Sequence, residues 1–368
     1  MDVFRKFLKR KDIVFTLQRY GIDALAAMAQ GLFCTLLVGT ILNTLGQQLG
    51  VGFLNEVIVT IGKGEGAVGY TVGGLASAMV GPGIAVAIGF ALHCPSLVLF
   101  SLIPVGFAAN AMGGAGGPLA VYVIAIVASE CGKLVSKETR IDILVTPIVT
   151  ILAGIGAASL IAAPIGAAAS AVGEAVKWAT AQQPFLMGIL VSVLVGMALT
   201  LPISSAAICQ ALTLTGLAGG AAVAGCCAQM VGFAVMSFRE NRWGGLVAQG
   251  VGTSMLQMPN IVKNPRVWIP PTLASAITGP LATCLFRLEM NGAPVSSGMG
   301  TCGFVGQIGI YTGWIHDIAS GAKAAITPTD WLGLLLICFI LPAILSRFFC
   351  VILRKWGWIQ ENDLKLEL

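Results

Sequence analysis

Residues 143–169 read ILVTPIVTILAGIGAASLIAAPIGAAA and contain no charged side chain. A membrane-spanning helix needs about 20 predominantly apolar residues. Apolar runs of this kind recur from about residue 20 to residue 353, with short polar breaks between them. The pattern predicts an all-α polytopic membrane protein with about ten transmembrane helices.

The composition of the chain excludes a soluble fold. Hydrophobic residues make up 57% of its 368 residues and charged residues 10%, whereas soluble domains average about 25% charged residues. The 47 glycines and 16 prolines recur inside the apolar runs, where neighbouring helices or a watery cavity can satisfy the backbone groups that they free. We therefore expect closely packed and frequently broken helices.

Basic residues flank the first and the last apolar run. Arg354, Lys355 and Lys365 follow the last run, and residues 1–19 hold six of the 21 Lys and Arg residues. These six are Arg5, Lys6, Lys9, Arg10, Lys11 and Arg19. The positive-inside rule then predicts that both termini are cytoplasmic and that the number of spans is even. The first apolar run is too long for a signal peptide, so we predict a retained span.

The chain changes character near residue 170. Residues 20–169 form the conventional spans of a first transmembrane half. Residues 170–183 mix apolar, charged and amide side chains, which is typical of a helix lying along the membrane interface. Residues 184–368 form a second half, in which 244–314 is rich in amides, hydroxyls, prolines and glycines. Such a segment predicts broken helices or re-entrant hairpins that are buried or line a cavity.

Polar side chains inside apolar segments mark candidate sites, because an unpartnered polar group is costly in a membrane. The densest group is LQMPNIVKNPRVWIPP at 256–271, which contains Gln257, Asn260 and Asn264. Their amides offer both donors and acceptors, as a polyhydroxylated solute requires. For Asn264 the alternative is a cytoplasmic loop in which Asn-Pro is merely a turn.

A second polar group is NGAPVSSGMGTCGFVGQIG at 291–309. Its glycines allow the backbone to approach a ligand closely, and Asn291, Thr301 and Gln307 are its candidate solute ligands. The alternative interpretation is close helix packing through small residues. A GxGxxG-like match lacks the strand-then-helix context of a nucleotide site, so we exclude that function.

The first half supplies two further candidate solute ligands. His93 precedes a proline break compatible with a polar cavity, and Asn110 precedes a glycine-rich break. A satisfied structural histidine is the alternative for His93 and for His316. The ten cysteines show no CxxC or metal-ligand spacing and are predicted to be free and buried. No nucleophile, base and orienting group occur together, so we predict no catalytic residue, metal, cofactor or conventional enzyme.

Three motifs carry a resemblance to a known family: NPRVWIPPTLAS at 264–275, TGP at 278–280 and GMGTCG at 298–303. They resemble the IIC-type membrane proteins grouped with the perfringolysin regulatory protein, a branch similar to the membrane component of phosphoenolpyruvate-dependent sugar phosphotransferase systems. The resemblance covers nearly the whole chain. It implies a homodimer of ten or so spans, an interfacial helix in mid-chain, re-entrant hairpins in a mobile substrate domain, and elevator-like movement.

The same resemblance implies that the first half is the scaffold and dimerisation domain and that the second half carries the solute. The sugar-transporting families place a glutamate shortly before the Asn-Pro motif, where this chain has Gln257 and Met258. The chain also has no soluble phosphocarrier domain of its own, so phosphorylation requires separate phosphocarrier partners.

Two functions fit the sequence. The first is a cell-membrane transporter for a small polar, sugar-like solute. The alternative is a membrane-embedded ligand sensor that regulates gene expression with the same fold. The expected partners are the solute, a second copy of the chain, phosphocarrier proteins and the lipid bilayer, and no nucleic acid.

Overall fold

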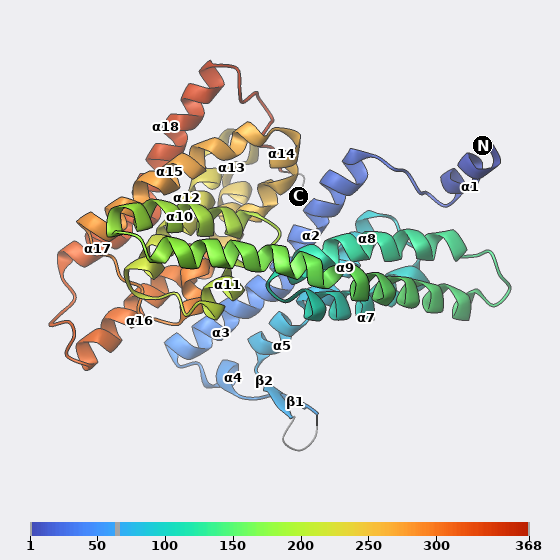
Figure 1. Cartoon of the computed structure of the whole chain (residues 1–368), viewed down its shortest axis with the longest axis horizontal. Coiled ribbons are helices and arrows are strands. Elements are labelled where there is room, and N and C mark those ends of the chain that lie inside the picture. The colour runs from blue at the N-terminus through green and yellow to red at the C-terminus, as the bar shows by residue number, and fades with distance from the viewer. Residues whose placement is uncertain (1, 63–66, 367–368) are drawn as a thin grey trace. The chain divides into compact units, whose positions relative to one another are not determined.

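The structure is a computed structural model that describes residues 2–62 and 67–366. The described residues are mostly helical, with a single antiparallel sheet of two short strands, in which Val59 pairs with Tyr70. The chain divides into two compact units, Met1–Ala169 and Ser170–Leu368, here called unit 1 and unit 2 (Figure 1). The boundary falls within one long helix, α9. The all-α fold class predicted from the sequence is confirmed.

Besides short π-helical and 3-10 turns, the described residues of unit 1 form ten complete α-helices and strands and most of α9. In chain order they are α1 (Asp2–Arg10), α2 (Ala24–Leu32), α3 (Val38–Leu49), α4 (Gly52–Asn55), β1 (Val59–Ile61), β2 (Val68–Tyr70), α5 (Val72–Ala78), α6 (Val80–Ala91), α7 (Ser96–Gly113), α8 (Gly117–Val135) and α9 (Asp142–Thr180). Helix α6 packs against α2, α7 and α8. Small residues allow these close approaches, since Gly31 faces Gly83 and Gly81 faces Gly106.

Unit 2 begins with the end of α9 and continues through nine further helices. These are α10 (Pro184–Thr200), α11 (Ser205–Ala211), α12 (Gly216–Met236), α13 (Phe238–Val247), α14 (Met258–Lys263), α15 (Ile269–Pro280), α16 (Val305–Ala319), α17 (Pro328–Leu335) and α18 (Leu341–Lys355). Residues 170–180 continue α9 without a break, so this part of the chain is not a separate helix. Its position at the membrane interface stays a prediction.

Five helical runs of the described residues are long and apolar enough to cross a membrane, or six if the bent pair α5 and α6 is one span. The five are Arg19–Gln47, Ser96–Val135, Asp142–Thr180, Gly216–Met236 and Pro328–Lys355. This number is lower than the ten or so crossings predicted. One reason is that the run Ser96–Val135 contains two helices, α7 and α8, which pack against each other across a break at Gly114. Another is that unit 2 divides its apolar sequence into short helices.

Helix α12 is the centre of unit 2. It packs against α10, α15 and α18, and 89% of its most apolar 18-residue stretch is buried. Glycines permit the contacts, because Gly225 of α12 lies against the backbone of Ser192 in α10, and Gly188 of α10 lies against Gly279 of α15. A helix this enclosed positions any polar side chain that it carries inside the unit.

The substitution Gly225→Ala is expected to lower the free energy of unfolding by about 1–3 kcal/mol, the usual cost of overpacking a core. The added Cβ would overlap the Ser192 carbonyl, which is backbone and cannot move aside cheaply. Gly156→Ala is the matched control, since nothing lies within 4 Å of the Cβ there and alanine favours a helix. Denaturation of the purified variants in detergent measures both. Equal stability of the two variants would contradict this packing.

Candidate solute site

The segment between α12 and α15 is repeatedly broken. Helix α13 runs into a π-helical turn at Ala248–Gly252, followed by a 3-10 turn at Ser254–Gln257, α14, and another 3-10 turn at Pro265–Trp268. Pro259 and Pro265 each stand in the first turn of a helical element, where a missing N–H does no harm. The amide side chains of the segment are therefore held at short helix ends.

Three of these amides and the hydroxyl of Ser237 form a buried chain of hydrogen bonds, here called the amide network. Gln249 Nε2 donates to Ser237 Oγ at 2.9 Å, and Gln257 Nε2 donates to Gln249 Oε1 at 2.8 Å. Asn260 Nδ2 then donates to Gln257 Oε1 at 2.8 Å. Gln249 and Gln257 are fully buried and Asn260 nearly so. Two of the predicted ligands, Gln257 and Asn260, thus lie together.

The C-terminal tail, residues 356–366, accepts the remaining donors of this network. Gln257 Nε2 also donates to Leu364 O at 3.1 Å, and Asn260 Nδ2 to Lys365 O at 2.9 Å. Asn241 holds the tail from its other side, donating to Leu364 O at 2.7 Å. Main-chain carbonyls of the tail therefore accept hydrogen bonds from both Gln257 and Asn260.

Asn264, the third predicted residue of this stretch, also binds the tail. Its Nδ2 donates to Trp358 O at 2.9 Å and to Asp363 Oδ2 at 2.8 Å. Its Oδ1 accepts from Arg266 N at 3.2 Å, which caps the following 3-10 turn. Asn264 therefore both caps the turn that follows it and holds the tail in place.

A second polar cluster surrounds Gln229, the amide in the middle of α12. Gln229 Oε1 accepts from Trp268 Nε1 at 3.0 Å and from Thr200 Oγ1 at 3.3 Å. Its Nε2 is 3.3 Å from Thr272 Oγ1, and Thr200 Oγ1 lies 2.8 Å from Ser254 Oγ. None of these residues was predicted as a site residue from the sequence. Gln229 could have been, because a single amide inside an apolar span indicates a functional role.

Thr301 and Gln307 also face α12. Thr301 is fully buried with its hydroxyl 3.5 Å from Met230 Sδ, and Gln307 Nε2 lies 3.2 Å from Cys227 Sγ. Gln307 Oε1 is buried and has no hydrogen-bond partner among the described residues. An unmade hydrogen bond of this kind costs about 1–3 kcal/mol, so this oxygen is a buried acceptor that the described residues leave unsatisfied.

The structure places Asn291 apart from the amide network. Its Oδ1 accepts from Gly216 N, the first residue of α12, at 3.1 Å. Its Nδ2 donates to Asp317 Oδ2 at 2.8 Å and to Glu289 Oε2 at 3.1 Å. All of its polar atoms are thus engaged by the protein, at the start of α12.

The two candidates of the first half belong to unit 1. His93 is exposed, and its Nδ1 lies 3.2 Å from Asp12 Oδ2. Asn110 lies in α7, where its side chain is close to Gly81 and Gly117. The ten cysteines are free, as predicted, and six of them are buried.

The family model for phosphotransferase system, EIIC, matches residues 22–366. The chain belongs to the phosphotransferase-system EIIC family. This EIIC chain is accordingly a multi-pass membrane protein of the sugar-transporter-like component of such systems. Comparison with curated proteins and with solved structures gave no match for it.

Proposed function

We propose that this EIIC chain carries a small polar, sugar-like solute across the cell membrane and that unit 2 binds it. The observation that carries the proposal is a buried set of amide donors facing main-chain carbonyls of the tail. A sugar hydroxyl accepts from the same donors as a carbonyl does. The unpaired Gln307 Oε1 adds an acceptor, so the region offers both kinds of partner that a hydroxyl needs.

The transport movement that we infer is elevator-like. Unit 2 is the moving substrate domain in this proposal, and unit 1 is the scaffold and the interface of a homodimer. Both termini lie in the cytoplasm, since basic residues flank the first and last apolar runs. A separate phosphocarrier protein supplies the phosphoryl group if transport is coupled to phosphorylation.

The tail contacts favour a second candidate function, that of a membrane-embedded sensor that regulates gene expression. A solute that takes the donors of Gln257 and Asn260 displaces the tail from them, which changes a segment that we place in the cytoplasm. Uptake of labelled solute into proteoliposomes distinguishes the two. Uptake supports the transporter, whereas binding without uptake supports the sensor.

The solute class is identified by a thermal-shift screen of the purified protein against sugars, sugar phosphates, sugar acids and nucleosides. A polyhydroxylated compound that raises the unfolding temperature supports the proposal. The site is then tested with the same compound.

Gln307→Met is expected to weaken binding of that compound about two- to tenfold, because one net hydrogen bond is worth about 0.5–1.5 kcal/mol. The same change is expected to leave the unliganded protein equally or more stable, since it removes a buried acceptor without a partner. Gln210→Met, at an exposed position of α11, is the control. Titration calorimetry measures affinity and thermal unfolding measures stability. Unchanged affinity would place the solute elsewhere.

A further inference from the structure

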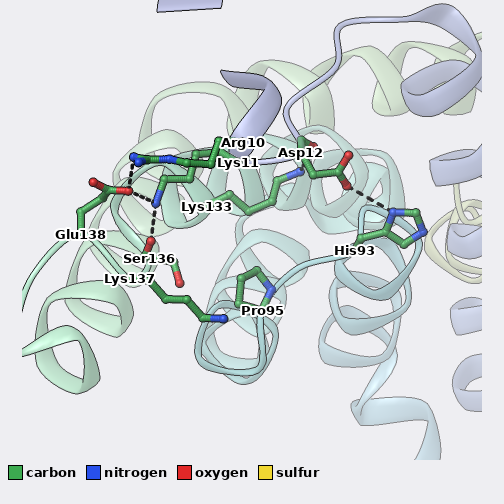
Figure 2. A pocket seen from close by; sticks show the side chains of 9 residues that line it. All are labelled: Arg10, Lys11, Asp12, His93, Pro95, Lys133, Ser136, Lys137 and Glu138. Carbon is green, nitrogen blue, oxygen red and sulfur yellow. Dashed lines mark hydrogen bonds and ion pairs between the residues drawn. The ribbon is translucent and has the colours of Figure 1, made fainter. Parts of the chain in front are cut away.

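A cavity of about 370 Å³ lies wholly within unit 1. Three segments far apart in the sequence form it: the end of α1 with the residues after it, the connection between α6 and α7, and the end of α8 with its following loop (Figure 2). The lining residues are Arg10, Lys11, Asp12, His93, Pro95, Lys133, Ser136, Lys137 and Glu138. None of them belongs to unit 2, and His93 is the one that the sequence suggested as a solute ligand.

Cationic side chains outnumber carboxylates around this cavity. Four of them line it against Asp12 and Glu138. Asp12 is neutralised by Arg19, whose two Nη atoms lie 2.9 and 2.5 Å from its carboxylate oxygens. The Arg19 hydrogen bond lowers the pKa of Asp12 to about 2. Asp12 therefore stays paired with Arg19 at physiological pH and offsets little of the positive charge of the four cations that line the cavity.

Glu138 is shared between two cations. Arg10 Nη2 lies 2.7 Å and Lys11 Nζ 2.5 Å from the same oxygen, Oε1. Hydrogen bonding from Lys11 and the charge of Arg10 lower the pKa of the Glu138 carboxyl. One carboxylate is thus paired with two positive groups, and a second negative charge is needed to neutralise them.

Lys137 adds a cation without a salt bridge among the described residues. Its side chain is exposed, and Figure 2 shows it extending toward Pro95. The nearby Asp142 accepts from the Lys137 backbone N–H at 2.7 Å. Its carboxylate offsets one positive charge, and cations still outnumber carboxylates around the cavity. Lys137 is therefore available to an incoming anion.

A buried lysine that is paired with a carboxylate also lines the cavity. Lys133 is 2% exposed and is held by Glu130 at 3.0 Å and by the carbonyls of Asp12 and Leu92 at 3.0 and 3.2 Å. Pro95 stands at the N-cap of the 18-residue helix α7 and provides no side-chain acceptor. The positive end of that helix dipole therefore adds to the fixed cations.

Apolar residues exposed beside the cavity place it at the bilayer surface. Phe15 and Leu17 follow Asp12 closely in the chain and are 73% and 68% exposed. They precede the first span, Arg19–Gln47. Exposed apolar side chains next to a basic cluster are the pattern of a segment that lies on a membrane.

We propose that this cavity binds a phosphate group, carried either by free phosphate or by the headgroup of an anionic lipid. Guanidinium and ammonium groups bind phosphate through charge-assisted hydrogen bonds. The cavity has the size of a small-ligand pocket. A basic cavity at the end of transmembrane helices also fits lipid headgroups.

The experiment uses the full chain in detergent and two probes. One arm titrates inorganic phosphate against sodium chloride of equal ionic strength, and the other adds phosphatidylglycerol or phosphatidylcholine to the micelles. Thermal unfolding is the readout. The double variant Arg10→Gln/Lys137→Gln removes two exposed lining cations. Lys9→Gln removes an exposed cation of α1 that does not line the cavity.

The parent protein is expected to be stabilised by phosphate, by phosphatidylglycerol, or by both. The double variant should need about five- to tenfold more of the effective anion, and Lys9→Gln should behave as the parent. A response to phosphate alone identifies free phosphate as the ligand, and a response to phosphatidylglycerol alone identifies the lipid. The proposal is overturned if neither probe stabilises the parent, or if the double variant and the parent respond alike.

Discussion

A chain that ends at Trp356 is expected to bind the solute roughly 10- to 100-fold more tightly than the full-length protein. The donors of Gln257 and Asn260 are held by the carbonyls of Leu364 and Lys365, so a solute must first displace the tail. Each of these hydrogen bonds contributes about 0.5–1.5 kcal/mol. Apparent affinity falls in proportion to the fraction of molecules whose site is open. Titration calorimetry with the solute from the screen measures the gain.

Point variants distinguish the effect of releasing the tail on solute binding from the effect of deleting its residues. Leu364 is fully buried, so Leu364→Asp is expected to expel the tail and to reproduce much of the tighter binding. Glu361→Gln changes a side chain that is 83% exposed and should bind the solute as the parent does. If the truncated chain and Leu364→Asp fold normally yet show parental affinity, the tail does not cover the site.

Three residues of the proposed site could be grouped from the sequence because they share one short stretch. Gln257, Asn260 and Asn264 all lie between residues 257 and 264, and their proximity in the chain is enough to bring them together. The tail could not be predicted in the same way. Its acceptors are main-chain carbonyls, which every residue possesses, so no side-chain pattern marks residues 358–365 as partners of these amides.

A polar side chain near glycines does not by itself reveal its partner. Asn291 was predicted as a solute ligand, and in the structure its amide binds Gly216 at the start of α12. A ligand and a helix cap use the same hydrogen-bonding groups. Only the fold decides between them, and the site role of Asn291 stays a prediction.

In unit 1, the spacing of two charged residues along the chain indicates that their side chains form a pair. Lys133 opens a charged stretch, residues 133–140, which follows an apolar run and is predicted from the sequence to be a polar loop. In the structure α8 continues to Val135 and buries that lysine. Glu130 stands three residues earlier on the same helix, which is the spacing of facing side chains. The partner was therefore readable from the sequence, but the depth of its burial was not.

Glu130→Ala is expected to lower the free energy of unfolding by about 3–5 kcal/mol, because it leaves the ammonium of Lys133 buried without its counter-ion. Glu130 Oε2 lies 3.0 Å from Lys133 Nζ, and Lys133 is only 2% exposed. Tyr20 also loses an acceptor, since its hydroxyl donates to Glu130 Oε1 at 2.9 Å. Denaturation of the purified variant in detergent measures the loss.

The double variant Glu130→Leu/Lys133→Met is the matched control. Replacing both members of a buried ion pair by apolar residues of similar size is often close to neutral, so this variant should be markedly more stable than Glu130→Ala. Some loss is expected to remain, because Lys133 also binds the carbonyls of Asp12 and Leu92. If the double variant is as unstable as Glu130→Ala, the single substitution acts through lost packing rather than through an unpaired charge. A Glu130→Ala protein within about 0.5 kcal/mol of the parent, the range of ordinary surface changes, would mean that water reaches Lys133 and that the charge is not buried.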